Sequence, residues 1–349
     1  MPNDDVILNS ATFSAEAEGT LNRKLFGRYV KLVVADAFGK GIDLSNLQIQ
    51  FTVTSRIVQT MPSLNIRIWN LNEDTANAIT NEYFSINLSA GYQQFNGLIF
   101  TGLVTQAKKG REGANNGYLD ITAMEMDMSY NFSIMNQTLP AGWSQVDVFN
   151  AIVNRFNADG VSTITAGQAP ATAGKSNRPK IMYGATKDFA RSQAQTTSSN
   201  FFVHSGQLYM LPLDQVTGIA HDAVILNSES GLVGVPEQTI DGLIAKSLLR
   251  YDLLPGRIIQ VGRENINTID IKSPGNVYGN PLVVPGVSQN NQYKVLAIKH
   301  YGDTRSQDWY TDIVARPLDP ANGVAVVPGS QYQDFNPSRS EERRVGKEC

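Results

Sequence analysis

Apolar and polar residues alternate along much of the first part of the chain. Residues 47–53 read Leu-Gln-Ile-Gln-Phe-Thr-Val, and residues 64–68 read Leu-Asn-Ile-Arg-Ile. A period of two is typical of a strand with one buried face. Pro62 stands at the start of the second strand, where a missing N–H is tolerated. We therefore expect antiparallel β-structure over 28–138, including strands over 84–92, 98–108 and 118–126, a polar hairpin turn over 109–117 and a short helix over 72–80.

The pattern changes near Pro140. Ser144 followed by Asp147 fits the beginning of a helix, with Asp a weaker partner than Glu at the third position. The apolar residues after this cap recur at helical spacing, and Gly160 ends the element. A second, weaker helix is predicted over 186–199 and a hairpin over 201–210. Residues 140–213 thus predict a small α+β module. The apolar residues at helical spacing in its first helix are Trp143, Val146, Phe149, Ile152, Val153 and Phe156.

The strand pattern returns after residue 231. The expected strands cover 239–251, 256–262, 292–301 and 307–315, with Pro255-Gly256 and Pro274-Gly275 as turn signals. A long insertion over 263–291 lies where a hairpin connection is expected.

The two β regions resemble copies of one plan. Tyr118-Leu-Asp-Ile-Thr-Ala in the first corresponds to Trp309-Tyr-Thr-Asp-Ile-Val-Ala in the second. In both regions the preceding strand ends in basic residues. The predicted fold is mainly β with an α+β insert: two similar antiparallel β-barrel domains plus a small helix–hairpin module. The expected divisions are an N-terminal arm (1–27), the first barrel (28–139), the module (140–213), the second barrel (214–318) and a C-terminal extension (319–338).

Residues 339–349 read like a translated sequencing adapter, so we leave them out of the fold prediction. They contain Cys349, the one cysteine in the sequence. The remaining chain therefore offers no disulfide or thiolate ligand.

Composition narrows the class of function. Charged residues make up 17% of the chain and the net charge is −3, which gives no reason to expect specific nucleic-acid binding. No apolar run approaches the roughly 20 residues of a membrane span. The first residues lack the pattern of a secretory signal.

Sequence motifs for catalysis or metal binding are lacking. The three histidines, His204, His221 and His300, are not at metal-ligand spacing, and we expect His300 at a surface or interface. No nucleophile elbow, phosphate loop or dinucleotide fingerprint occurs. Two pairs of carboxylates could suggest glycoside hydrolysis. They are Glu16 with Glu18, and Glu125 with Asp127, the latter expected on one strand.

The order of β domain, α+β insert and second β domain resembles the baseplate hub of contractile-tailed phages, including the late-control protein D group. Residues 293–300, Gly302-Asp-Thr-Arg305 and residues 309–312 are similar to the closing hairpin of that family. Residues 184–189 through the Gly206 hairpin resemble its inserted module. The likeness covers roughly residues 28–318.

The resemblance implies a structural protein without enzymatic activity or cofactor. It implies a homotrimer that joins the sixfold tail tube to the threefold central spike and that contacts wedge or other tail proteins. Such a protein is made in the host cytoplasm and resides in the virion tail, where the genome can pass through its channel. Three alternatives stay open: the equivalent part of a tail-like injection device, a peptidoglycan-active or glycan-binding baseplate component, and a baseplate wedge protein, which would not form a threefold ring.

Basic residues recur near the ends of both repeated hairpins. We predict that they contact a neighbouring subunit or tail partner, although a solvated tip is the simpler interpretation. The candidate contact residues are Lys108, Lys109, Arg111, Lys299, His300 and Arg305.

Overall fold

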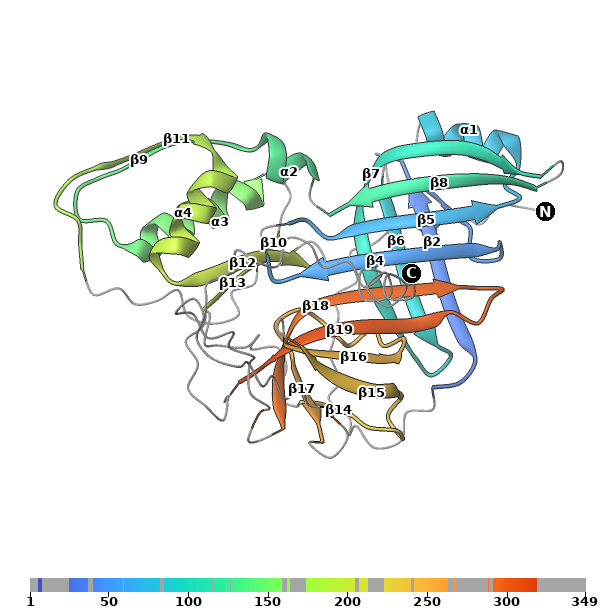
Figure 1. The fold of residues 1–349 in the computed structure, drawn as a ribbon. Coiled ribbons are helices and arrows are strands. Elements are labelled where there is room, and N and C mark those ends of the chain that lie inside the picture. Colours follow the sequence, from blue (N-terminus) through green and yellow to red (C-terminus); the bar gives the residue numbers. More distant parts are fainter. Residues whose placement is uncertain are drawn as a thin grey trace, which may run out of the picture.

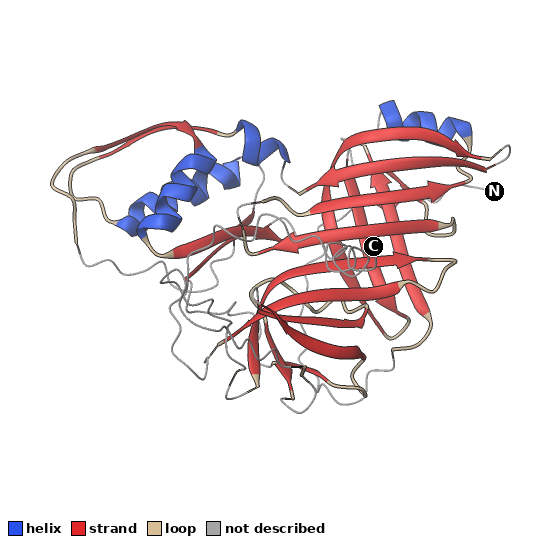
Figure 2. Cartoon of the chain, in the orientation of Figure 1, coloured by secondary structure: helices blue, strands red, loops and turns tan. Residues whose placement is uncertain are grey.

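The structure is a computed structural model, and it confirms a mainly β fold. Strands dominate and the few helices gather at two places (Figure 2). The residues that the structure describes are 6–7, 25–36, 40–58, 60–81, 85–113, 116–125, 127–158, 162–163, 174–204, 207–212, 223–239, 242–262, 266–267, 288 and 291–318.

The first β unit is built from six principal strands in the order β2-β6-β7-β8-β5-β4. Neighbouring strands in this series are antiparallel. Two short strands, β1 and β3, extend the sheet beyond β2, and one helix, α1, follows β5. The elements are β1 (Val6–Ile7), β2 (Arg28–Ala35), β3 (Lys40–Asp43), β4 (Ile49–Arg56), β5 (Ser63–Trp69), α1 (Glu73–Asn81), β6 (Ser85–Tyr92), β7 (Phe95–Glu112) and β8 (Asn116–Met124).

Alternation of apolar and polar residues explains how this unit forms its core. In β4 the residues Ile49, Phe51 and Val53 are buried, whereas their neighbours are more exposed. Strands β5, β6 and β8 show the same period, so each contributes one apolar face. These faces meet in one hydrophobic cluster with Leu32 of β2 and Ile79 of α1.

The second β unit repeats the plan with the order β14-β17-β18-β19-β16-β15. Its own cluster includes Leu226, Ile259, Val295 and Ile313. The expected strand over 239–251 is the second half of a β15–β16 hairpin, and β15 itself was not predicted. The strands are β14 (Val224–Leu226), β15 (Leu232–Thr239), β16 (Gly242–Leu248), β17 (Ile258–Val261), β18 (Gln292–Asp303) and β19 (Trp309–Pro317).

One strand joins the two units. The first residues of β18 pair with β17, while Ala297–Asp303 pair with β4 of the first unit. As a result, β7, β8, β5, β4, β18, β19, β16 and β15 lie side by side in one continuous layer (Figure 1). Strands β2 and β6 cross behind this layer.

The α+β module lies beside one end of the layer (Figure 1). Strand β9 pairs with β11 rather than with the barrel strands, so it belongs with the helices of the module. The predicted cap is present: Ser144 N donates to Asp147 Oδ2 at 2.7 Å and Asp147 N donates to Ser144 Oγ at 3.4 Å. The elements are α2 (Asp127–Phe132), β9 (Ile134–Leu139), α3 (Gln145–Ala158), β10 (Ser162–Thr163), β11 (Lys180–Ala185), α4 (Thr186–Thr196), β12 (Ser199–His204) and β13 (Gln207–Pro212).

Candidate functional site

The two β units share one topology as well as one strand count. Position by position, β2, β4, β5, β6, β7 and β8 correspond to β14, β15, β16, β17, β18 and β19, in the same chain order and the same sheet order. One difference is that β2 is antiparallel to β6 whereas β14 is parallel to β17. The stretches that end near residues 124 and 317 therefore fold alike, which supports an internal duplication.

Matching β-bulges show which residues of the two β units correspond. In the β7–β8 hairpin the pairing shifts between Val104 and Gln106, and in the β18–β19 hairpin it shifts between Val295 and Ala297. Such bulges insert one residue into one strand. When the two hairpins are aligned at their bulges, Lys108 corresponds to Lys299. Lys108 lies opposite Asp120 and Lys299 lies opposite Asp312, and each Asp is followed by Ile.

In the first copy, that Asp lies in a charged row on the outer face of the layer. Asp120 pairs with Lys108 on one side and Arg67 on the other. Arg67 Nε donates to Asp120 Oδ1 at 2.6 Å, and its guanidinium lies 4.1 Å from the centre of the Tyr118 ring. The hydrogen bond to Asp120 raises the pKa of Arg67. The side chains of Arg67 and Asp120 are each about one-third exposed, so solvent weakens this ion pair.

The second copy repeats the row. Asp312 pairs with Lys299 and with Lys246, and the Lys246 Nζ lies 4.5 Å from the centre of the Tyr310 ring. Burial raises the pKa of Asp312, and the two lysines oppose the shift. Burial also lowers the pKa of Lys246, but its hydrogen bond to Tyr301 and the nearby negative charge outweigh that effect and leave the pKa raised.

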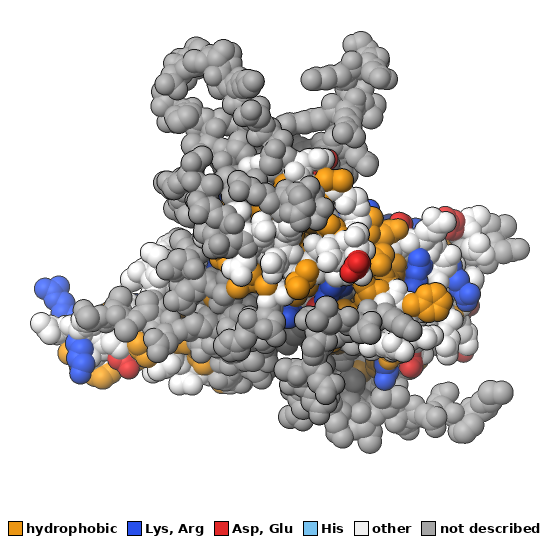
Figure 3. Space-filling model, turned by 90° about the horizontal axis from the view of Figure 1, so that it is seen from below, with side chains coloured by type: hydrophobic (Ala, Val, Ile, Leu, Met, Phe, Trp, Pro, Cys, Tyr) orange, Lys and Arg blue, Asp and Glu red, His pale blue; other side chains and the backbone are white. Residues whose placement is uncertain are grey.

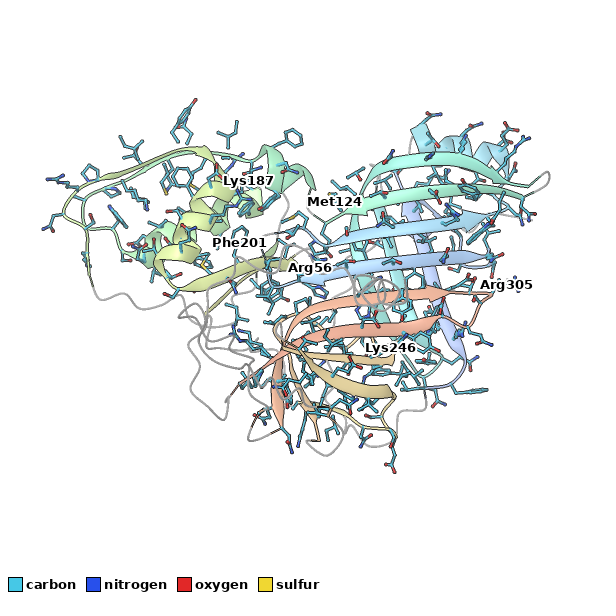
Figure 4. The ribbon with its side chains drawn as sticks, in the orientation of Figure 1. Arg56, Met124, Lys187, Phe201, Lys246 and Arg305 are labelled. Carbon is cyan, nitrogen blue, oxygen red and sulfur yellow. The ribbon has the colours of Figure 1, made fainter. Side chains whose placement is uncertain are left out.

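Five of the six predicted contact residues are wholly or partly exposed. Lys108, Lys109 and Arg111 are exposed on β7, and Lys299 is half-buried on β18. Arg305 is exposed in the β18–β19 turn, at the end of the layer opposite Arg56 and Met124 (Figure 4).

His300 corrects the prediction of an exposed tip. It is only 2% exposed, and its Nδ1 lies 2.8 Å from Thr311 Oγ1. Burial lowers its pKa to about 3. The strand continues to Asp303, and β4 covers the edge of β18 at this point. His300 is therefore an interior residue of the folded chain.

Those residues considered for catalysis that the structure describes do not form an exposed site. Glu125 is buried in the turn after β8, while Asp127 begins α2. The prediction that the two lie on one strand is therefore wrong. His204 is buried at 3.5 Å from Ser55 Oγ, and burial lowers its pKa to about 4. His221, Glu16 and Glu18 lie outside the described residues. Within the described ranges no cluster of His, Cys, Asp and Glu could hold a metal ion.

The structure adds an exposed apolar surface that the sequence did not indicate. Ile134 of β9, Ile181 and Tyr183 of β11 and the nearby Phe132 are all more than half exposed. Hydrophobic and basic side chains lie together at the outer end of the module (Figure 3). The sequence did not predict this surface because β9 contains Asn136 and Gln137, so its apolar and polar residues do not alternate regularly.

Comparisons with known proteins give a fold but no family. No family model matches the chain, and no curated protein matches its sequence. A tail protein from Neisseria meningitidis MC58 aligns with a TM-score of 0.53 and 11% identity, over 83% of this chain and 97% of that one. The 43 kDa tail protein of prophage MuSo2 from Shewanella oneidensis aligns with a TM-score of 0.51 and 7% identity, over 83% and 99%. The chain thus has the fold of these tail proteins.

Among the residues that the structure describes, no helix has the length and apolar character needed to cross a membrane.

Proposed function

We propose that this chain is a structural component of a phage-type tail baseplate, and specifically its central hub. In this role three copies form a ring that meets the sixfold tail tube on one face and the threefold spike on the other. The hub requires no cofactor and performs no catalysis. Its partners are other copies of itself, the tube protein, the spike protein and wedge or other tail proteins, and its place is the virion tail.

The observation that carries this proposal is the duplicated ladder of strands. Closed oligomers repeat one interface under rotation. A chain with two equivalent units places six equivalent units around a ring of three copies. Such a ring has threefold symmetry in its sequence and near-sixfold symmetry in its fold, which is what an adapter between a sixfold and a threefold partner requires.

The division of the chain follows from the same plan. We propose an arm before residue 28, two β units and the α+β module between them, with a C-terminal extension after residue 318. Strand β9 is counted with the module because Met135 and Leu139 lie in its hydrophobic cluster.

Native mass measurement of the purified protein tests the proposal. A trimer has three times the 38.2 kDa of the chain. A twofold or other even assembly, or a monomer at every concentration, would contradict the ring. Zymography on peptidoglycan gels tests the structural role separately: clearing by the wild-type protein would overturn it in favour of a lytic component.

A further inference from the structure

Strands β9 and β11 form a two-stranded antiparallel ribbon that lies against helices α3 and α4 (Figure 1). Its inner face contributes Met135, Leu139 and Met182 to the hydrophobic cluster of the module. Each strand has one edge paired with the other strand, and no described strand pairs with its second edge. The N–H and C=O groups of an unpaired edge can pair with a strand of another chain.

The outer face of the ribbon is apolar along β11. Ile181 and Tyr183 alternate on this strand, and their side chains are 74% and 75% exposed. Ile134 of β9 is 60% exposed and lies diagonal to Tyr183, since Tyr183 pairs with Asn136. Exposed apolar side chains that cluster in this way mark a surface for a partner.

Basic residues stand at both ends of β11. Lys180 begins the strand, and Lys187 follows its end in the first turn of α4. Arg178 is exposed just before the strand. The acid next to Lys187 is Asp188, and it lies 3.5 Å from Arg191. This surface therefore carries positive charge, although the net charge of the whole chain is −3.

These features favour a protein segment over a lipid surface as the partner. The unpaired edge of β11 can hydrogen-bond to a strand, whereas inside a bilayer its N–H and C=O groups would lose water without gaining a partner. Strand β9 offers a poorer neighbour, because Asn136, Gln137 and Thr138 are polar and exposed.

We infer that an extended segment of another tail protein adds as a strand to the unpaired edge of β11. Its apolar side chains lie beside Ile181 and Tyr183, and its carboxylates lie near Lys180 and Lys187 at the two ends of the strand. Because β11 has six residues, the paired part of the segment has about six as well. This contact rests on the proposed role in a tail, and it gives the α+β module a task separate from that of the β units.

The probe for this surface is the fluorescein-labelled peptide Glu-Glu-Val-Thr-Ile-Thr-Val-Thr-Ile-Glu-Glu. It alternates apolar and polar residues and carries carboxylates at both ends. The full-length chain is titrated into the peptide, and binding is followed by fluorescence anisotropy. A second peptide with Lys in place of every Glu tests the charge, and a third with Pro in place of the central Thr tests strand pairing.

Two variants of the chain and one control locate the binding. Ile181→Thr with Tyr183→Thr removes the apolar side chains but keeps strand-forming residues. Lys180→Gln with Lys187→Gln removes two positive charges. The matched control is Val235→Thr, because Val235 is 57% exposed on β15, outside the module. Far-ultraviolet circular dichroism verifies that each variant keeps the wild-type fold.

We expect the wild-type chain and the Val235→Thr control to bind the acidic peptide saturably. Binding should be about tenfold weaker in the variant that lacks Ile181 and Tyr183, because the apolar contact is lost. The variant that lacks Lys180 and Lys187 should bind the acidic peptide several-fold more weakly, and the wild-type chain should prefer the acidic peptide to the basic one. Bound acidic peptide should slow hydrogen exchange within residues 180–185, and the Pro-containing peptide should not.

Absence of saturable binding with millimolar peptide, equal binding of the acidic and basic peptides, or binding without slower exchange in β11 would each overturn the inference. Phosphatidylglycerol vesicles that bind the wild-type chain but not the variant without Ile181 and Tyr183 would assign the surface to a membrane instead. A trimer that the same variant reduces to single chains would assign it to a second copy. A trimer that binds no peptide overturns this inference and leaves the hub proposal standing, whereas a monomer that binds the peptide contradicts the ring and leaves the inference standing.

Discussion

Trp309 should hold the two β units together, and its replacement gives the sharpest prediction for the isolated chain. It lies on β19 of the second unit, yet its side chain is 2% exposed inside the cluster of the first unit. Its ring meets Phe51 edge-on at 5.4 Å, and its Nε1 donates to Gly91 O at 3.0 Å. The guanidinium of Arg28 lies 5.4 Å from the ring centre.

Two substitutions separate the contribution of the buried Trp309 ring from that of its hydrogen bond. Trp309→Ala removes a buried aromatic and leaves a cavity, which costs about 3–5 kcal/mol in comparable cores. Trp309→Phe keeps a ring against Phe51 but leaves the carbonyl of Gly91 without its donor, at about 1–3 kcal/mol. Trp143→Phe is the control, because Trp143 is only partly buried and its bond from Nε1 to Arg178 O is exposed.

Urea unfolding followed by far-ultraviolet circular dichroism measures the losses. Hydrogen exchange on peptides from β4 and β18 shows whether the joint between the units opens first. We expect Trp309→Ala to split unfolding into two transitions, because the two units lose a large core residue that they share. A single transition with a loss below about 1 kcal/mol, far under the cost of such a cavity, would refute the reasoning.

Three further predictions follow from described contacts. Because burial lowers the pKa of His204 to about 4 and of His300 to about 3, both are neutral when folded but charged below about 6.5 when unfolded. The free energy of unfolding should therefore be level above about pH 6.5 and fall as the pH drops towards 4, and His204→Gln should flatten that decline in urea titrations. Ser144→Ala removes a helix cap and should cost about 0.5–2 kcal/mol, whereas Ser144→Thr should cost much less, as thermal unfolding can show. Arg67→Ala should change stability by about 1 kcal/mol or less, because its ion pair with Asp120 is one-third exposed, and a larger loss in a double-mutant cycle would contradict that view.

Local patterns in the sequence were enough to predict the duplication of the β unit. The Tyr-x-Asp-Ile-x-Ala pattern recurs in β8 and β19, and in both strands the Asp is half-buried and the Ile after it is buried. The helices α1, α3 and α4 lie where helices were predicted, and the cap at Ser144 begins α3 with the Asp147 partner that the sequence indicated. Of the apolar residues at helical spacing in α3, Val146 is an exception, since its side chain is 38% exposed. These features depend on residues close to each other in the chain.

Two strands were hidden because their sequences break the alternating pattern. In β15, Gly234 and Pro236 interrupt the alternation, and the strand survives because the irregularity faces an edge of the layer, where a missing N–H is tolerated. In β9, polar residues face solvent on one side while Met135 and Leu139 enter the module's core.

The burial of His300 depends on contacts that are distant in the sequence. Its partner in β4 is Val53, and no local pattern relates the two segments. The same holds for the Arg67–Asp120 pair, which depends on the register of β5 against β8. A residue can be placed on a strand from the sequence, but its neighbours across the sheet require the register.

Linking two units in one chain makes the joints of the proposed ring unequal. The joint inside each chain is long and continuous, since Gln50–Arg56 all have partners in β18. It is reinforced by Trp309 and by Arg28, which donates to the backbone oxygens of Asp303 and Gln307. The joint between chains in the proposed ring has no covalent link, so dilution should separate the ring into single chains while leaving each pair of units intact, as native mass measurement can show. Threefold symmetry follows because each chain contributes two units of different sequence, although the fold alone would permit sixfold symmetry.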